Sequence, residues 1–70
     1  MYTVLVIDDS ASMRRIIKDI INNIDDFEVI DTASDAYDAR EKIKLYEPDL
    51  VTIDLNMPKY KHTKVNNEKQ

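Results

Sequence analysis

The sequence contains no glycine, no cysteine and no tryptophan, and only two prolines. Without cysteine the chain can form neither a disulfide nor a thiolate metal site, which fits a reducing compartment. Its apolar runs are far too short to span a membrane, and its N-terminus has no basic segment followed by a long apolar stretch. We therefore expect a cytoplasmic protein without membrane insertion.

The 70 residues allow one small domain, and a chain of this size is marginally stable without help. Its net charge of -4 is distributed unevenly. Residues 1–58 carry thirteen acidic and six basic side chains, whereas residues 59–70 carry four lysines and one glutamate. The acidic part is a poor match for nucleic acid, whose binding depends on phosphate neutralisation. The polar basic tail, residues 59–70, has no periodicity that would bury a face, and we predict it to be disordered.

Apolar residues alternate between strand-like runs and helical spacing along the chain. Short β-branched runs predict strands at 3–7, 27–33 and 50–53. Between them, two segments have apolar residues at helical spacing, 11–24 and 35–46. The pattern indicates an N-cap at Ser10 for the first helix, an N-cap at Ser34 or Asp35 for the second, and an end of the second helix at Pro48. The apolar face of the first helix is predicted to pack against the core, and it consists of Met13, Ile16, Ile17, Ile20, Ile21 and Ile24.

This β-α-β-α-β order predicts an α/β protein with a parallel three-stranded sheet. In strand order 2-1-3 the right-handed crossover rule places one helix on each face of the sheet. The first and third strands are then neighbours, and their carboxyl ends meet at a topological switch point, where open α/β sheets bind ligands.

Acidic residues follow two of the predicted strands directly. Asp8 and Asp9 come after the first strand, and Asp54 comes after the third. In order 2-1-3 the three carboxylates would converge and repel one another, and Mg²⁺, which prefers oxygen ligands and binds phosphates, would relieve that repulsion. A carboxylate beside such an ion can accept a phosphoryl group. The alternative is that these acids only cap helices or form turns.

The segments "VLVIDDSASMRRII" and "PDLVTIDLNMP", with the spacing between them, resemble the receiver domain of bacterial two-component response regulators. Among chemotaxis receivers, the resemblance is greatest to that of the methylesterase and next to the single-domain regulator. It implies a truncated flavodoxin-like fold and a phospho-accepting rather than enzymatic role, with a chemotaxis-type histidine kinase as partner. The resemblance implies that Asp54 is phosphorylated, that Asp9 contacts Mg²⁺ directly and Asp8 through water, and that Asn56 offers its backbone carbonyl to the metal.

The resemblance covers residues 3–59, and we expect residues 1–58 to be a partial receiver domain. The pattern stops at Lys59, and no residue of this chain matches the family's switch serine or threonine, its lysine at the phosphoryl group, or any methylesterase domain. The third strand is then expected at a sheet edge, where it invites a homodimer. The alternative function is a non-phosphorylatable truncated fragment that only self-associates or docks on a histidine kinase.

Overall fold

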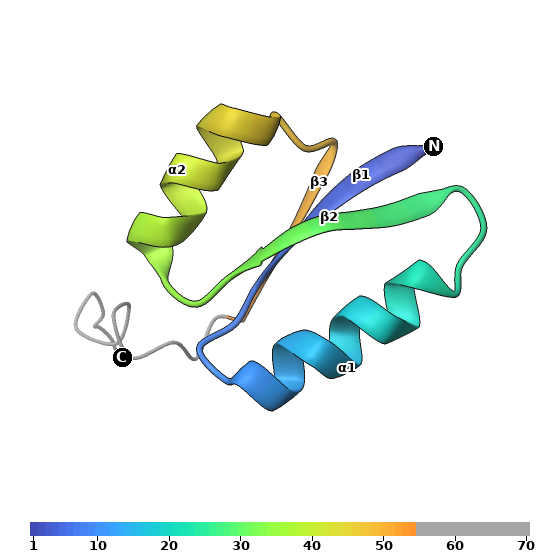
Figure 1. Ribbon diagram of the computed structural model, residues 1–70, viewed down its shortest axis with the longest axis horizontal. Coiled ribbons are helices and arrows are strands. Elements are labelled where there is room, and N and C mark those ends of the chain that lie inside the picture. The colour runs from blue at the N-terminus through green and yellow to red at the C-terminus, as the bar shows by residue number, and fades with distance from the viewer. Residues whose placement is uncertain (55–70) are drawn as a thin grey trace, which may run out of the picture.

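The computed structural model describes residues 1–54 of the chain. Asn56 and the basic tail, residues 59–70, lie outside the described residues, so the predictions made for them stay predictions. The described part confirms the β-α-β-α-β order (Figure 1). Its elements are β1 (Tyr2–Ile7), α1 (Ala11–Asn22), β2 (Phe27–Ala33), α2 (Ala36–Tyr46) and β3 (Leu50–Ile53). Within residues 1–54, neither helix has the length and apolar character needed to cross a membrane.

The three strands form one parallel sheet in the order β2-β1-β3, as predicted. β1 is the central strand and pairs with β3 from Val4↔Leu50 to Ile7↔Ile53. The two helices lie on opposite faces of this sheet (Figure 1). The right-handed crossover rule therefore gives the observed arrangement, with the carboxyl ends of β1 and β3 side by side.

Alternate residues of β1 supply a small core on each face of the sheet. Leu5 and Ile7 pack with Ala33 and Ala39 on the α2 side. On the α1 side, a second cluster contains Val4, Val6 and Val29, with Ile17, Ile21 and Phe27 packed against it. Because successive side chains of a strand point to opposite faces, one buried strand can anchor both helices.

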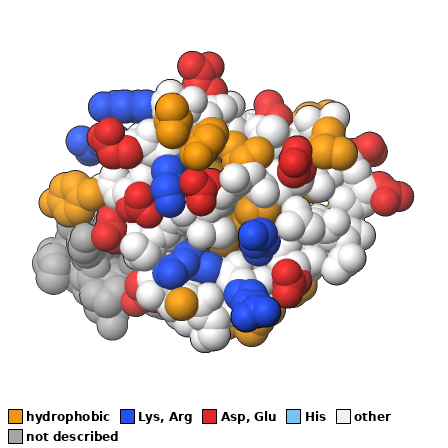
Figure 2. All heavy atoms as spheres, viewed as in Figure 1, with side chains coloured by type: hydrophobic (Ala, Val, Ile, Leu, Met, Phe, Trp, Pro, Cys, Tyr) orange, Lys and Arg blue, Asp and Glu red, His pale blue; other side chains and the backbone are white. Residues whose placement is uncertain are grey.

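The prediction that the whole apolar stripe of α1 faces the core is wrong in part. Ile17 and Ile21 pack on the sheet, but Ile16 and Ile20 are 49% and 58% exposed. Hydrophobic side chains also reach the surface elsewhere in the described residues, and Figure 2 shows several of them between charged groups. The reason is geometric: an apolar stripe on a helix spans about 100° or more, and three strands cover only part of that width.

Both helices begin at capping side chains. The Ser10 hydroxyl accepts a hydrogen bond from the Met13 backbone N–H at 3.3 Å, which confirms the predicted cap of α1. Of the two candidates for α2, Asp35 is the cap, and its carboxylate accepts from the Asp38 N–H at 2.8 Å. These bonds satisfy backbone donors that the first helical turn leaves without partners.

A polar clamp at the start of β3 aligns it with β1. The Asp49 carboxylate accepts the Thr3 backbone N–H at 2.8 Å and lies 3.2 Å from the Thr3 hydroxyl. In return, the Asp49 N–H lies 3.0 Å from the Thr3 carbonyl oxygen. A slip of one residue would shift β3 by about 3.3 Å along the sheet, so this clamp also determines where the strand's carboxyl end falls.

Lys42 ties α2 to β2. Its ammonium group donates to the Thr32 carbonyl at 2.6 Å and to Asp38 at 3.2 Å, and it lies 3.5 Å from Asp31. Burial alone would lower the pKa of Lys42, but the hydrogen bond to Asp38 and the charge of Asp31 outweigh it and raise that pKa. A lysine pKa raised by folding adds stability below the ordinary lysine value, and this contribution is lost as pH rises through the raised pKa.

The chain has no glycine, and within residues 1–54 two other residues adopt positive φ. Glu47, which ends α2, has φ 48° and ψ 58°, and Asp26 has φ 73°. We expect Glu47→Gly to raise the free energy of unfolding by about 1 kcal/mol, because glycine adopts the left-handed conformation without the steric cost of a Cβ. Chemical denaturation measures this change.

The control for that prediction is Glu41→Gly, in the exposed interior of α2. The same substitution there should lower stability by about 1 kcal/mol, because glycine is a poor helix residue. Equal effects of the two substitutions would show that the conformation of Glu47 carries no steric cost.

Candidate metal and phosphoryl site at the carboxyl ends of β1 and β3

Asp8 continues β1 by one residue at the carboxyl edge of the sheet. Its N–H donates to the Ala33 carbonyl of β2 at 3.0 Å, and its side chain is only 5% exposed. One carboxylate oxygen accepts the Ser10 N–H at 2.9 Å, which forms a turn leading into α1. One carboxylate oxygen of Asp8 therefore has the turn-forming role that was the alternative to metal binding.

Asp54 occupies the corresponding position after β3. Its N–H donates to the Ile7 carbonyl at 3.1 Å, so the hydrogen bonding between β1 and β3 extends to this residue. The residue is half-buried. The backbone of Asp54 is thus bonded to the central strand directly after the end of β3.

Asp9 lies in the loop between β1 and α1 and is exposed. Within residues 1–54, its carboxylate has no hydrogen-bonding or ion-pairing partner. A helix-capping role is therefore not observed for this acid: Ser10 caps α1 instead. Its carboxylate remains available to a ligand.

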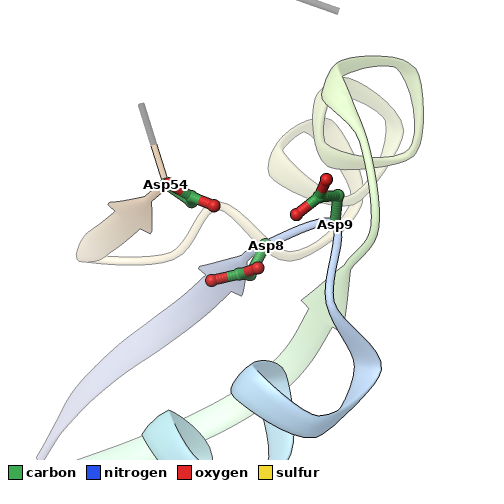
Figure 3. Close-up of side chains that lie close together, drawn as sticks. All are labelled: Asp8, Asp9 and Asp54. Carbon is green, nitrogen blue, oxygen red and sulfur yellow. The ribbon is translucent and has the colours of Figure 1, made fainter. Parts of the chain in front are cut away.

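The carboxylates of Asp8, Asp9 and Asp54 come together, as the strand order requires. Each contributes an oxygen to a group whose members all lie within 4.8 Å of one another. Figure 3 shows the three side chains meeting in the space beyond the ends of β1 and β3. Carboxylates this close repel, so the arrangement favours binding of a cation between them.

The donor set suits Mg²⁺. All the ligand atoms are carboxylate oxygens, and Mg²⁺ is bound in proteins by a few such oxygens together with waters and phosphate oxygens. The predicted fourth contributor, the backbone carbonyl of Asn56, lies outside the described residues.

An open cavity lies beside the acids on the α1 side of the sheet. Its volume is about 320 Å³, and Asp8, Thr52 and Asp54 line it together with apolar residues of the strands and of α1, which are Ile7, Ile53, Met13 and Ile17. This space is larger than a hydrated ion needs, so a phosphoryl group could enter beside Asp54.

The structure adds one contact at this site that the sequence analysis did not predict. The Arg14 guanidinium donates from Nη1 to the backbone carbonyl of Asp8 at 2.9 Å. Arg14 also lines a groove between α1 and β2 with Arg15 and Lys18, and Figure 2 shows basic side chains on this face. The only available sequence signal is spacing, because residue 14 lies one turn into the helix that follows the acid pair.

A parallel sheet in order 2-1-3 with carboxylates at its switch point defines a doubly wound α/β domain with a candidate ligand site at that point. The response regulator receiver domain family matches residues 4–65. The chain belongs to this family, and it is a receiver of the chemotaxis response-regulator type.

Two relatives and one solved structure illustrate the similarity. The chain is 52% identical over 59 residues to a protein-glutamate methylesterase/protein-glutamine glutaminase of Hahella chejuensis, with 84% of this chain and 16% of the relative covered. It is 56% identical over 55 residues to the protein of that name from Caldanaerobacter subterraneus, with 79% and 15% covered. The response regulator domain of Thermotoga maritima CheB superposes with a TM-score of 0.78 at 45% identity, covering 83% of this chain and 43% of that domain.

The chain therefore spans a small share of the methylesterase relatives and less than half of the solved receiver domain. The matched region is the receiver part of these proteins, so the similarity concerns signal reception. It favours the receiver interpretation over that of a fragment that cannot be phosphorylated.

Proposed function

We propose that this chain is a regulatory, non-enzymatic phospho-acceptor of a chemotaxis-type phosphorelay, with Asp54 as the acceptor. A histidine kinase of the chemotaxis type is the proposed physiological donor, and acetyl phosphate or a similar acyl phosphate is the small-molecule substitute. The observation that carries the proposal is the convergence of Asp8, Asp9 and Asp54 at the carboxyl edge of a receiver-family sheet.

In the proposed reaction, a carboxylate oxygen of Asp54 attacks phosphorus. The new O–P bond forms as the bond from phosphorus to the donor breaks, and the donor leaves with the electron pair. Asp8 and Asp9 would hold Mg²⁺, which would supply positive charge to offset that of the carboxylates and of the phosphoryl group. The Asp54 backbone bond to Ile7 keeps the nucleophile in place, since phosphoryl transfer depends on positioning and charge neutralisation.

Intact-mass measurement after incubation with acetyl phosphate and Mg²⁺ tests this proposal. The chain should gain the mass of one phosphoryl group, and the gain should disappear when EDTA removes the metal. A folded chain that binds Mg²⁺ yet gains no mass after prolonged incubation would contradict the proposed function.

We further propose that the chain self-associates through β3. Within residues 1–54, β3 is at the edge of the sheet, and Leu50 and Ile53 are 47% and 50% exposed. Free backbone groups and apolar side chains on an edge strand support pairing with a second chain. The melting temperature should then rise with protein concentration, because association stabilises the folded state by mass action.

Leu50→Lys should remove that concentration dependence, because charge on an edge strand opposes pairing. Leu45→Lys is the control, since Leu45 is 72% exposed on α2 and is not part of β3. Sedimentation velocity measures the association directly. A compact monomer at high concentration would exclude the dimer while leaving the phospho-acceptor proposal intact.

A further inference from the structure

The loop that carries Asp8 and Asp9 is held at several points. The Asp8 N–H is bound to the Ala33 carbonyl, and one Asp8 carboxylate oxygen is bound to the Ser10 N–H. These contacts involve the N–H and the side chain of Asp8, whereas the peptide that joins Asp8 to Asp9 is held through a separate acceptor, the Asp8 carbonyl oxygen. The orientation of that peptide determines the direction in which Asp9 leaves the strand.

Arg14 makes the contact to this carbonyl. Its guanidinium lies 2.9 Å from the Asp8 oxygen and is partly buried. The Arg14 backbone is in turn fixed by its own N–H, which donates to the Ser10 carbonyl at 2.9 Å in the first turn of α1. The helix therefore holds the guanidinium, and the guanidinium holds the peptide between the two acids.

Asp9 depends on this support more than the other two acids do. Asp8 has a side-chain hydrogen bond, and the Asp54 backbone is bonded to β1. Asp9 is exposed and, among the described residues, has no side-chain partner of its own. Its position relative to the other carboxylates therefore depends on the backbone and on its own rotamer, with no side-chain contact within residues 1–54 to fix it.

We infer that Arg14 is a positioning residue for the acid cluster: by holding the Asp8 carbonyl, it sets the place of Asp9 for Mg²⁺ binding. This inference rests on the proposed function, since it assigns a role at the same site. Residues that orient metal ligands through hydrogen bonds typically contribute about 10- to 100-fold to metal affinity.

Charge and positioning predict opposite signs for the effect of removing Arg14. A guanidinium near a cation site repels Mg²⁺, so an effect of charge alone would make Arg14→Met bind Mg²⁺ more tightly. A positioning role predicts weaker binding, because the hydrogen bond to the Asp8 carbonyl is lost. Arg15 provides the matched control: it is exposed, it carries the same charge on the next residue, and the described residues include no contact from it to the acid loop.

The experiment compares Mg²⁺ dissociation constants of the unchanged chain, Arg14→Met and Arg15→Met by titration at a low temperature where all three are folded by circular dichroism. We expect Arg14→Met to bind about 10- to 100-fold more weakly and Arg15→Met to bind equally or slightly more tightly. Arg14→Gln keeps a hydrogen-bond donor without the charge, so its Mg²⁺ dissociation constant should lie between those of Arg14→Met and Arg15→Met. It replaces Arg14→Met in the comparison if that variant does not fold. The backbone amide resonance of Asp9 should shift in Arg14→Met and stay in place in Arg15→Met.

Equal or tighter Mg²⁺ binding by a folded Arg14 variant would overturn the inference and leave the proposed function standing. A similar loss in both arginine variants would also overturn it, since the loss would then not depend on the contact of Arg14 with the Asp8 carbonyl. If the unchanged chain bound no Mg²⁺, the site itself would be excluded, and the role of Arg14 with it.

Discussion

The Asp54→Asn variant is expected to take no phosphoryl label from acetyl phosphate under conditions in which the unchanged chain is labelled. An amide is a far weaker nucleophile than a carboxylate, so this substitution removes the attacking atom and nearly preserves the shape of the side chain. The backbone bond from residue 54 to the Ile7 carbonyl does not involve the side chain and should persist. Intact-mass measurement checks the result, and peptide mapping of the unchanged chain should place the label on Asp54.

Asp25→Asn is the control for this experiment. It makes the same change of charge in the turn after α1. This turn lies at the opposite end of β1, where the backbone carbonyl of the adjacent Asp26 accepts a hydrogen bond from the Tyr2 N–H. This variant should be labelled like the unchanged chain. Equal labelling of Asp54→Asn would mean that another carboxylate is the acceptor, and Asp9 would be the first candidate because its side chain is exposed.

The strand order could be predicted from the sequence because it follows from general rules. Buried β-branched runs alternating with amphipathic segments allow few parallel arrangements, and the right-handed crossover leaves order 2-1-3 as the one that brings Asp8 and Asp54 together. The carboxylates themselves were informative, because acids directly after parallel strands must lie at the carboxyl edge of the sheet.

Contacts between residues distant in sequence could not be predicted in this way. The clamp between Thr3 and Asp49 joins residues 46 positions apart, and no local pattern links them. The contact of Arg14 with a backbone carbonyl likewise depends on a side-chain rotamer that the sequence does not specify. Such contacts nevertheless control the site, since one aligns β1 with β3 and the other holds the acid loop.

The sequence also did not predict that part of the apolar face of α1 is exposed to solvent. Helical spacing shows that Ile16 and Ile20 lie near Ile17 and Ile21 on the same side of the helix, and this led to the prediction that all four are buried. Which of them meets the sheet depends on how the helix is rotated about its axis and on how far the sheet extends beneath it. Periodicity identifies an apolar face, whereas packing determines how much of that face is covered.

Mg²⁺ is expected to stabilise the fold, and Asp9→Ala to abolish that gain. An ion that binds only the folded state at a hundred times its dissociation constant adds about 2.7 kcal/mol to the free energy of unfolding. For a domain of this size, the gain corresponds to a rise of roughly 10 to 20 °C in melting temperature. Thermal unfolding with Mg²⁺ and with EDTA measures the difference.

Asp9 is the most informative of the three acids for this test. Because its carboxylate has no partner within residues 1–54, Asp9→Ala should cost the metal-free protein little, and relief of repulsion in the cluster should even stabilise it. Asp8→Ala would also break the bond to the Ser10 N–H, so its metal-free form should be less stable. Asp25→Ala, at the other end of the molecule, should keep the full gain.

The effect of Asp9→Ala on the melting temperature should therefore differ in sign with and without Mg²⁺. An acid with a purely structural role would not give this difference. Without metal, Asp9→Ala should unfold at the same or a higher temperature than the unchanged chain, and with saturating Mg²⁺ at a much lower one. If the melting curves of a folded sample were indifferent to Mg²⁺, or if Asp9→Ala kept the gain, Asp9 would not be a ligand. The arrangement of carboxylates in Figure 3 would then be a feature of the receiver fold without metal binding in this chain.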